Sequence, residues 1–174
     1  QPKPSRNQSK GQHMGKRSDF EKIEKDAYMT TDPRATAPLL RYLDGESLSY
    51  YEPCVGNGDL VRLLSPLVCV GFSDDDKDAR TTTYKTTARY FITNPPWSRV
   101  LLHPIIENLR NQLPTWLLFD SDWMFTAQSA PYMKYCHAIL PVGRLRWMPE
   151  TKMDGKDNCA WYLFLKDETP TTFY

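Results

Sequence analysis

The sequence lacks the patterns of a metal site, of a disulfide-stabilised secreted domain and of a membrane anchor. Its four cysteines are widely spaced, no Cys-x-x-Cys pair occurs, and the three histidines follow no ligand spacing, which argues against zinc. Free cysteines in apolar stretches behave as small hydrophobic residues and indicate a reducing, cytosolic type of compartment. No signal peptide and no apolar run of transmembrane length is present, so we expect no membrane association.

The common phosphate-binding glycine loops and a strong net charge are also missing. No Gly-Lys-Ser/Thr follows a glycine turn, and the Gly-x-Gly-x-x-Gly spacing of dinucleotide-binding folds is incomplete. This excludes a P-loop, and a lone glycine turn is weak evidence for a ligand. The 22 lysines and arginines nearly balance the 21 aspartates and glutamates, which gives a net charge of +1. The molecule as a whole is therefore no obvious binder of polyanions.

The 174 residues predict one domain with a basic extension at its start. Residues 1–18 carry five lysines and arginines ahead of the first acid, Asp19. This segment is polar, which predicts a disordered basic tail. We interpret it as a solubilising tail, with an arm that touches phosphates as the alternative.

The rest of the chain alternates strand-like and helix-like patterns, which is typical of an α/β fold with a largely parallel sheet. The predicted strands are Leu48–Glu52, Leu67–Phe72, Thr81–Tyr84, Tyr90–Thr93, Thr115–Phe119, Cys136–Leu140 and Ala160–Leu165. The predicted helices run from Asp32-Pro33 to Gly45, over Leu60–Leu64, from Arg99 to Asn111 and from Thr126 to Tyr135. Asp32 is the expected N-cap of the first helix, in which Pro38 predicts a kink or a tight first turn.

The most informative motif is Asn94-Pro95-Pro96-Trp97, which follows the strand Tyr90–Thr93. Two consecutive prolines cannot donate backbone hydrogen bonds, so the strand must end there. In open α/β sheets ligands bind at the carboxyl ends of the strands. An amide, rigid carbonyls and a flat ring suit a planar group that bears an exocyclic amine. Taken alone, the tetrapeptide fits a simple strand-ending turn equally well.

Two further predicted strands end in motifs that suit a ligand. Glu52-Pro53 is followed by Gly56 and Gly58, and glycine lets the backbone approach a ligand closely. The next strand ends in Asp74-Asp75-Asp76, where an acid typically holds ribose hydroxyls. We assign this role to Asp74, with Asp75 as the alternative. Because the three motifs fall at one edge of one sheet, they predict a single site.

In this order the motifs resemble those of amino-methyltransferases that use S-adenosylmethionine, in particular adenine-N6 DNA methyltransferases of phage and bacterial type. Tyr28–Leu40 is similar to their N-terminal cofactor motif, and Tyr50–Gly58 to their Leu-Glu-Pro…Gly-x-Gly turn. Phe91–Trp97 closely resembles their catalytic strand, Asn/Asp-Pro-Pro-aromatic. The resemblance extends over most of the chain, from Asp19 to Leu165.

The resemblance implies a Rossmann-like class I methyltransferase fold, with a mostly parallel seven-stranded sheet and an antiparallel late hairpin. Residues 19–174 would form a single catalytic domain with no separate target-recognition domain. Such a domain would act in the cytoplasm of a bacterium or of a phage-infected host cell, or on the nucleoid.

The resemblance also implies S-adenosylmethionine as the cofactor and S-adenosylhomocysteine as its product, without a metal. The residues that it assigns to the cofactor are Tyr28, Thr30, Glu52, Pro53, Gly56, Gly58, Asp74 and Asn94. The residues that it assigns to catalysis are Asn94, Pro95, Pro96 and Trp97. The side-chain carbonyl of Asn94 and the backbone carbonyl of Pro95 would accept hydrogen bonds from the target amine, and Trp97 would stack on the base. The usual acid that contacts the cofactor's adenine is missing, and Thr82, Thr83 or a backbone group is the candidate replacement.

The implied reaction is a direct in-line methyl transfer to the N6 amine of adenine in DNA, with a duplex base flipped into the pocket. Adenine in RNA, a glutamine amide of a protein, and a degenerate fold that only binds remain as alternatives. The residues expected to contact the substrate are Trp97, Ser98, Arg144 and Arg146. Both arginines could face phosphates or form the exposed edge of a hairpin. A partner subunit or a second copy of the chain would then supply target recognition.

Overall fold

The structure is a computed structural model that describes residues 29–174 except 45–47, 66 and 151. The tail of residues 1–18, the cofactor candidate Tyr28 and the helix-ending Gly45 therefore lie outside the described residues. The helices are η1 (Pro33–Ala35), α1 (Ala37–Tyr42), α2 (Asp59–Leu63), α3 (Arg99–Arg110), η2 (Ser121–Phe125), η3 (Ala127–Ser129) and α4 (Ala130–Met133). The strands are β1 (Ser49–Glu52), β2 (Val68–Phe72), β3 (Tyr90–Thr93), β4 (Thr115–Asp120), β5 (Cys136–Arg144), β6 (Asn158–Phe164) and β7 (Thr172–Phe173).

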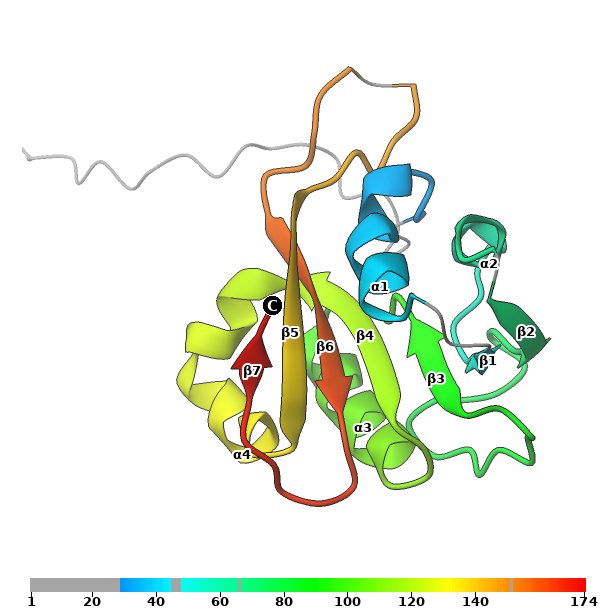
Figure 1. The fold of residues 1–174 in the computed structure, drawn as a ribbon, viewed down its shortest axis with the longest axis vertical. Coiled ribbons are helices and arrows are strands. Elements are labelled where there is room, and N and C mark those ends of the chain that lie inside the picture. The colour runs from blue at the N-terminus through cyan, green and yellow to red at the C-terminus, as the bar shows by residue number, and fades with distance from the viewer. Residues whose placement is uncertain (1–28, 45–47, 66, 151) are drawn as a thin grey trace, which may run out of the picture.

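All seven strands form one sheet in the order β2-β1-β3-β4-β6-β5-β7 (Figure 1). Strand β6 pairs antiparallel with both β4 and β5, and the other neighbours pair in parallel. The predicted fold class is confirmed, because the sheet is mostly parallel and its late pair β5–β6 is antiparallel.

One predicted strand, Thr81–Tyr84, is wrong. This segment is irregular, because side chains of α3 and of its C-terminal end bind its backbone in place of a neighbouring strand. Gln112 Oε1 accepts from the Tyr84 N–H at 2.9 Å, and Asn108 Nδ2 donates to the Thr82 carbonyl at 2.9 Å. The seventh strand is instead β7, which lies beside β5 at the opposite edge of the sheet.

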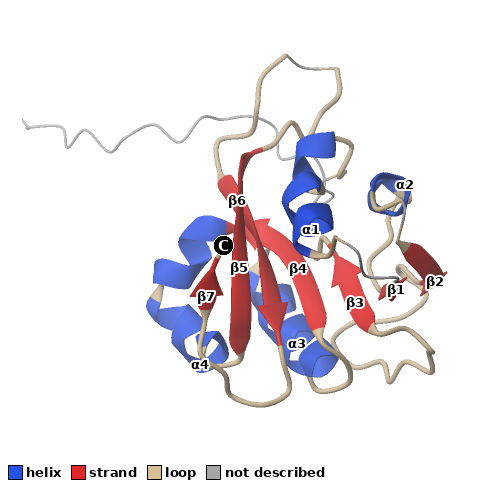
Figure 2. Ribbon diagram, in the orientation of Figure 1, coloured by secondary structure: helices blue, strands red, loops and turns tan. Residues whose placement is uncertain are grey.

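Helices cover both faces of the sheet, with α1 in front and α3 behind it (Figure 2). Helix α3 buries one apolar face, formed by Leu102, Ile105, Ile106 and Leu109, at the spacing of an amphipathic helix. Pro38 is the second residue of α1, where its missing N–H costs no hydrogen bond. The separate turn η1 precedes α1, so the expected tight start of the first helix is confirmed.

Aromatic contacts on the α1 face fix the segment that precedes this helix. The indole Nε1 of Trp161 in β6 donates to the Ala35 carbonyl at 2.7 Å, and both residues are fully buried. The rings of Tyr42 and Trp116 meet edge to face, with their centroids 5.3 Å apart. The hydrogen bond holds η1, and the ring contact holds α1, at a fixed place on the sheet.

Candidate functional site

The carboxyl ends of β1 and β3 lie side by side at the point where the strand order reverses. From β1 the chain continues to β2 on one side, and from β3 it continues to β4 on the other. Ligands of open α/β sheets bind at such a switch point. Glu52 ends β1 and Asn94 directly follows β3, so two of the predicted site residues lie at these neighbouring strand ends.

The glycine turn after β1 adopts a backbone that favours glycine. Gly56 has a φ of 48° and Gly58 a φ of 76°, both in the left-handed region. The Gly56 N–H donates to Asp74 Oδ1 at 3.3 Å. This bond ties the turn to the acidic end of β2, so the structure brings the predicted glycines and the predicted ribose ligand together.

A cavity of about 310 Å³ connects the three predicted motifs, and its volume is within the range of small-molecule sites. Pro53 of the glycine turn, Asp74 and Asp75 after β2, and Pro96 of the Asn-Pro-Pro-Trp motif all line it. Its remaining walls come from the turn after β1, from the chain after β2 and from α3: Cys54, Lys77, Asp78, Ala79, Arg80, Leu101 and Ile105.

Asp78 is a wall residue that the sequence-based reasoning missed. Its carboxylate pairs with Arg80 at 2.7 Å, and the hydrogen bonds from Arg80 lower its pKa to about 2. The predicted replacement Thr82 instead gives its carbonyl to Asn108 and Gln112. An acid four residues after Asp74, followed by an arginine, was the available signal, and the expected strand at Thr81–Tyr84 concealed it.

Glu52 is a fully buried acid at the end of β1, directly before the wall residue Pro53, with an exposed fraction of 0%. Neither of its carboxylate oxygens reaches hydrogen-bond geometry with a described residue. Burial raises its pKa well above the ordinary value, while the Thr93 hydroxyl and the Cys54 backbone N–H act in the opposite direction. A buried acid of this kind suits a cationic ligand group, which would favour its charged form.

The amide of Asn94 is held from both ends. Its Nδ2 donates to Thr30 Oγ1 at 3.0 Å, and its Oδ1 accepts from Trp97 Nε1 at 3.0 Å. Next to Thr30, the sulfur of Met29 accepts from Asn57 Nδ2 in the glycine turn at 3.0 Å. Residues 29 and 30 therefore bridge the glycine turn and the Asn-Pro-Pro-Trp motif, and the assignment of Thr30 to the cofactor stays a prediction.

The four predicted substrate residues have different surroundings. Trp97 is only 8% exposed, and its ring meets that of Trp147 edge to face at 5.3 Å, so stacking of Trp97 on a base stays a prediction. Ser98 is exposed at the start of α3, and Arg144 is exposed at the end of β5. Arg146 is half-buried, and its backbone N–H donates to Asp32 Oδ2 at 3.0 Å.

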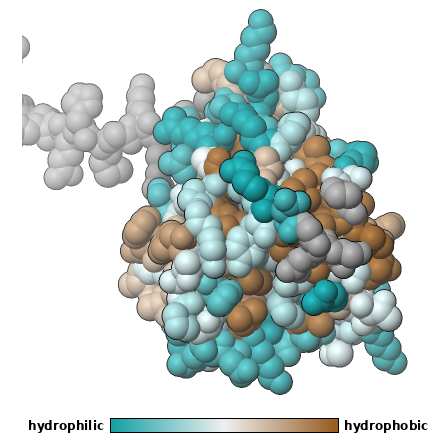
Figure 3. Space-filling model, in the orientation of Figure 1, coloured by the Kyte–Doolittle hydropathy of each residue, from teal (hydrophilic) through white to brown (hydrophobic). Residues whose placement is uncertain are grey.

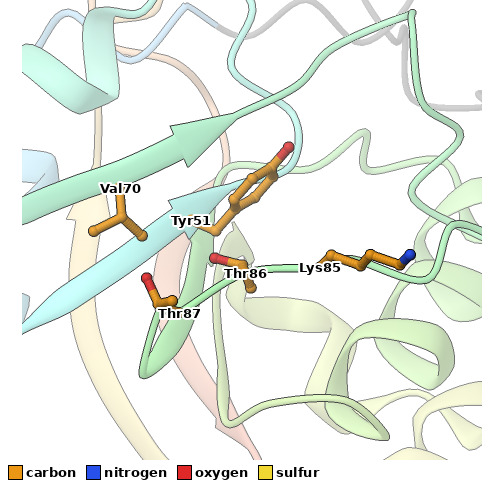
Figure 4. Close-up of a pocket in the computed structure, with 5 residues that line it drawn as sticks. All are labelled: Tyr51, Val70, Lys85, Thr86 and Thr87. Carbon is orange, nitrogen blue, oxygen red and sulfur yellow. The ribbon is translucent and has the colours of Figure 1, made fainter.

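A second hollow, of about 470 Å³, is lined by none of the predicted site residues (Figure 4). Tyr51, Val70 and residues 85–87 line it. The crossover from β2 to β3 contains no helix, which leaves the apolar Val70 of the edge strand 43% exposed. This hollow follows from the missing helix and brings no predicted site residue together.

Among the described residues, no three or more His, Cys, Asp or Glu side chains are grouped so that they could hold a metal ion. None of the helices in this part of the chain combines the length and the apolarity that crossing a membrane requires.

No protein-family model matches the chain, and no curated protein matches its sequence. Solved structures are similar in fold. A protein of Listeria monocytogenes, assigned to the class I S-adenosylmethionine-dependent methyltransferases, matches with a TM-score of 0.50 at 12% identity, over 78% of this chain and 59% of that chain. A dimethyladenosine transferase from Plasmodium falciparum has a TM-score of 0.50 at 15% identity, over 74% of this chain and 59% of that one.

A third similar structure is the modification subunit of a protein from Vibrio vulnificus assigned to the type I restriction enzymes. It has a TM-score of 0.50 at 13% identity, over 84% of this chain and 46% of that one. The chain thus spans 46–59% of the length of these three structures. The likeness is one of fold, and it establishes that this chain has the fold of class I methyltransferases.

Proposed function

We propose that this chain is an S-adenosylmethionine-dependent methyltransferase that methylates the N6 amine of adenine in DNA. The observation that carries the proposal is the cavity at the switch point, whose walls include Pro53, Asp74 and Pro96. These residues come from the three motifs that carry the resemblance to adenine-N6 methyltransferases. Two proteins of similar fold support the choice, since one is named a dimethyladenosine transferase and the other a modification subunit.

The residues around the cavity suit the parts of this cofactor. Asp74 and Asp75 line the cavity, and Asp74, with Asp75 as the alternative, would accept hydrogen bonds from the ribose hydroxyls. Glu52 is a buried acid without a hydrogen-bonded partner among the described residues, which suits the amino group of the methionine part. Asp78 is our candidate for the acid beside the adenine ring. When bound, the cofactor supplies a methyl group that its sulfonium already activates.

Asn94 and Pro95 would orient the target amine. The amide oxygen of Asn94 accepts one hydrogen bond from Trp97, and its second lone pair can accept another. Together with the backbone carbonyl of Pro95 it would hold the two N–H groups of the amine and direct the nitrogen lone pair at the methyl carbon. The N–C bond forms as the C–S bond breaks, and the amine then releases one proton to water. The contribution of the protein is positioning and stabilisation of the charge that grows on nitrogen.

The loop between β5 and β6 supports a nucleic-acid substrate. It projects beyond the carboxyl edge of the sheet (Figure 1), at an end of the molecule where hydrophilic residues dominate the surface (Figure 3). Arg144 at its start and Lys152 and Lys156 within it are exposed, so they can reach phosphates. Met153 is 78% exposed in the same loop and offers an apolar contact for an unstacked base.

A panel of substrates tests the proposal. The protein would receive cofactor with a labelled methyl group together with single-stranded DNA, duplex DNA, RNA or a protein extract. We expect label in DNA, recovered as N6-methyl-2′-deoxyadenosine by mass spectrometry, and binding of S-adenosylhomocysteine in calorimetry. Label in RNA alone would mean that the substrate is adenine in RNA, and label in protein would point to a glutamine amide as the substrate.

The variant Asn94→Ala serves as the internal control of this panel. It removes the amide that orients the amine, so we expect methyl transfer to fall by at least about a hundredfold, while binding of S-adenosylhomocysteine largely remains. Turnover at the wild-type rate would contradict the role of Asn94. Failure of the wild-type protein to bind either form of the cofactor would refute every enzymatic reading.

A further inference from the structure

Asn94 belongs to a closed ring of contacts that includes the loop between β5 and β6. Of this loop, residues 145–150 and 152–157 are described. The amide oxygen of Asn94 accepts from Trp97 at 3.0 Å, and the Trp97 ring meets the Trp147 ring of the loop at 5.3 Å with an interplanar angle of 86°. On its other side the Asn94 amide nitrogen donates to Thr30 at 3.0 Å.

The loop is fastened next to Thr30. Asp32 Oδ2 accepts from the backbone N–H of Arg146 at 3.0 Å, directly before Trp147. Arg34 donates to Asp32 at 2.6 Å and to Asp154 of the loop at 2.8 Å. We call these four residues, Asp32, Arg34, Arg146 and Asp154, the loop clamp.

The two halves of the loop clamp differ in strength. The Asp32 side chain is only 8% exposed. Burial opposes its charge, but hydrogen bonds from Arg34 and from the Arg146 backbone lower its pKa to about 2, so it stays an anion near neutral pH. The Arg34 and Asp154 side chains are 52% and 35% exposed, so water and salt weaken their pairing. We call the Arg34–Asp154 pair the outer link and the hydrogen bonds of Asp32 to Arg34 and to the Arg146 backbone the inner link. The outer link can therefore be broken without disturbing the inner link.

The loop itself is shaped around Trp147. The Gly155 N–H donates to the Leu145 carbonyl at 2.7 Å and closes the neck of the loop. A Cβ at Gly155 would lie 2.8 Å from Trp147 Cδ1, so only glycine leaves room for the indole. Trp147 thus packs between Gly155 and Trp97.

We propose that Trp147 is a positioning residue for the amide of Asn94, and that the loop clamp holds it in place. The inference rests on the proposed methyl transfer. Trp97 and Thr30 hold the two ends of the Asn94 amide, so the orientation of Trp97 helps to set the plane of the amide whose oxygen would receive the target amine. Trp147 contacts Trp97 and through it helps to fix that plane. The loop thereby connects the surface that would meet the nucleic acid to the atom that would hold the base.

Kinetics of Trp147 variants test the role in orientation. We expect Trp147→Ala to lower kcat at least about tenfold while KM for DNA changes less than about threefold. Trp147→Phe keeps an aromatic edge against Trp97 and should recover most of kcat. An increase of KM with kcat unchanged would show that Trp147 only contacts the substrate and would overturn the proposal, as would equal rates for the Ala and Phe variants.

The clamp is tested without reference to activity. Asp154→Ala cuts the outer link, and Asp157→Ala removes an exposed acid from the same loop as the matched control. We expect faster amide hydrogen exchange at residues 145–150 and a weaker near-ultraviolet circular dichroism signal of the indole pair in Asp154→Ala only. Equal exchange and equal spectra in the two variants would overturn the proposal.

The two kinds of failure can be told apart. A wild-type protein that binds no cofactor and transfers no methyl group would refute the proposed function, whatever the spectra show. A wild-type protein that methylates DNA while Trp147→Ala keeps its full kcat would refute only the positioning role.

Discussion

Glu52 has a pKa that its burial raises. Its side chain is fully buried at the end of β1, and burial raises its pKa well above the ordinary value of 4.5. In the folded protein the acid therefore binds a proton more tightly than in the unfolded chain. Below the unfolded pKa this preference contributes its full stability, and the contribution is lost as the pH rises through the folded pKa.

The variant Glu52→Gln should remove this pH dependence, because glutamine is neutral and nearly isosteric. At about pH 5 we expect similar melting temperatures for the wild type and the variant, and at about pH 8 a more stable variant. The difference should approach about 1.4 kcal/mol for each tenfold difference in proton affinity between the folded and unfolded states. Thermal unfolding in a series of buffers measures it. Parallel losses of stability with pH in both proteins would show that Glu52 does not cause the trend.

At the level of elements, the packing of the edge strand β2 against β1 requires a close approach of the two strands at Gly71. Gly71 pairs with Tyr51 of β1, and a Cβ at Gly71 would lie 2.7 Å from the Tyr51 ring. The ring has little room to move, because it packs against Tyr84 at 5.0 Å and Phe91 at 6.2 Å between centroids. Gly71 therefore determines how β1 and β2 fit together, and with them the two strand ends that frame the cavity.

We expect Gly71→Ala to destabilise the protein by about 1–3 kcal/mol, which is typical of an overpacked site. Val70→Ala is the matched control, since Val70 is the neighbouring residue, is 43% exposed, and should change stability by less than about 1 kcal/mol. Urea unfolding followed by circular dichroism measures both. If Gly71→Ala is as stable as Val70→Ala, the Tyr51 ring can shift and the contact is not restrictive.

Some of the strands can be predicted from local sequence patterns, and others cannot. Strand β3 is an apolar run that ends just before Pro95 and Pro96, and β4 is one that begins directly after Pro114, so local pattern alone identifies them. The Thr81–Tyr84 segment has strand-forming residues, but its backbone partners come from Asn108 and Gln112, more than twenty residues later in the chain. Strand β7 has only two residues and therefore carries no periodic signal.

The features of the candidate site likewise fall into those that local sequence patterns identify and those that they do not. The glycine turn, Asp74 and Asn94 each sit beside a recognisable strand, so the shared edge of the sheet follows from chain order. The contact of Trp97 with Trp147 joins segments fifty residues apart and depends on how a loop folds back. Local patterns contain nothing that fixes such a contact, and the loop clamp was missed for that reason.

Across the whole molecule, charge is balanced in total, and exposed cations lie at both ends of the sheet. The net charge is +1, yet Arg144, Lys152 and Lys156 are exposed around the loop that projects beyond the carboxyl edge (Figure 1). The turn after β6, which carries the exposed Lys166, lies at the opposite end of the sheet. Binding of a polyanion should therefore depend on the location of a cation rather than on the total charge.

Salt dependence of DNA binding tests this distribution, because each phosphate contact releases counterions. Arg144→Ala should weaken binding and reduce the slope of log affinity against log salt by about 0.9 for duplex DNA or about 0.7 for single strands. Lys166→Ala makes the same change of net charge at the far end and should leave the slope at its wild-type value. Fluorescence anisotropy of labelled DNA over a range of salt concentrations gives both slopes. Equal reductions in the two variants would mean that only total charge matters, and an unchanged slope in Arg144→Ala would place the phosphates away from the start of this loop.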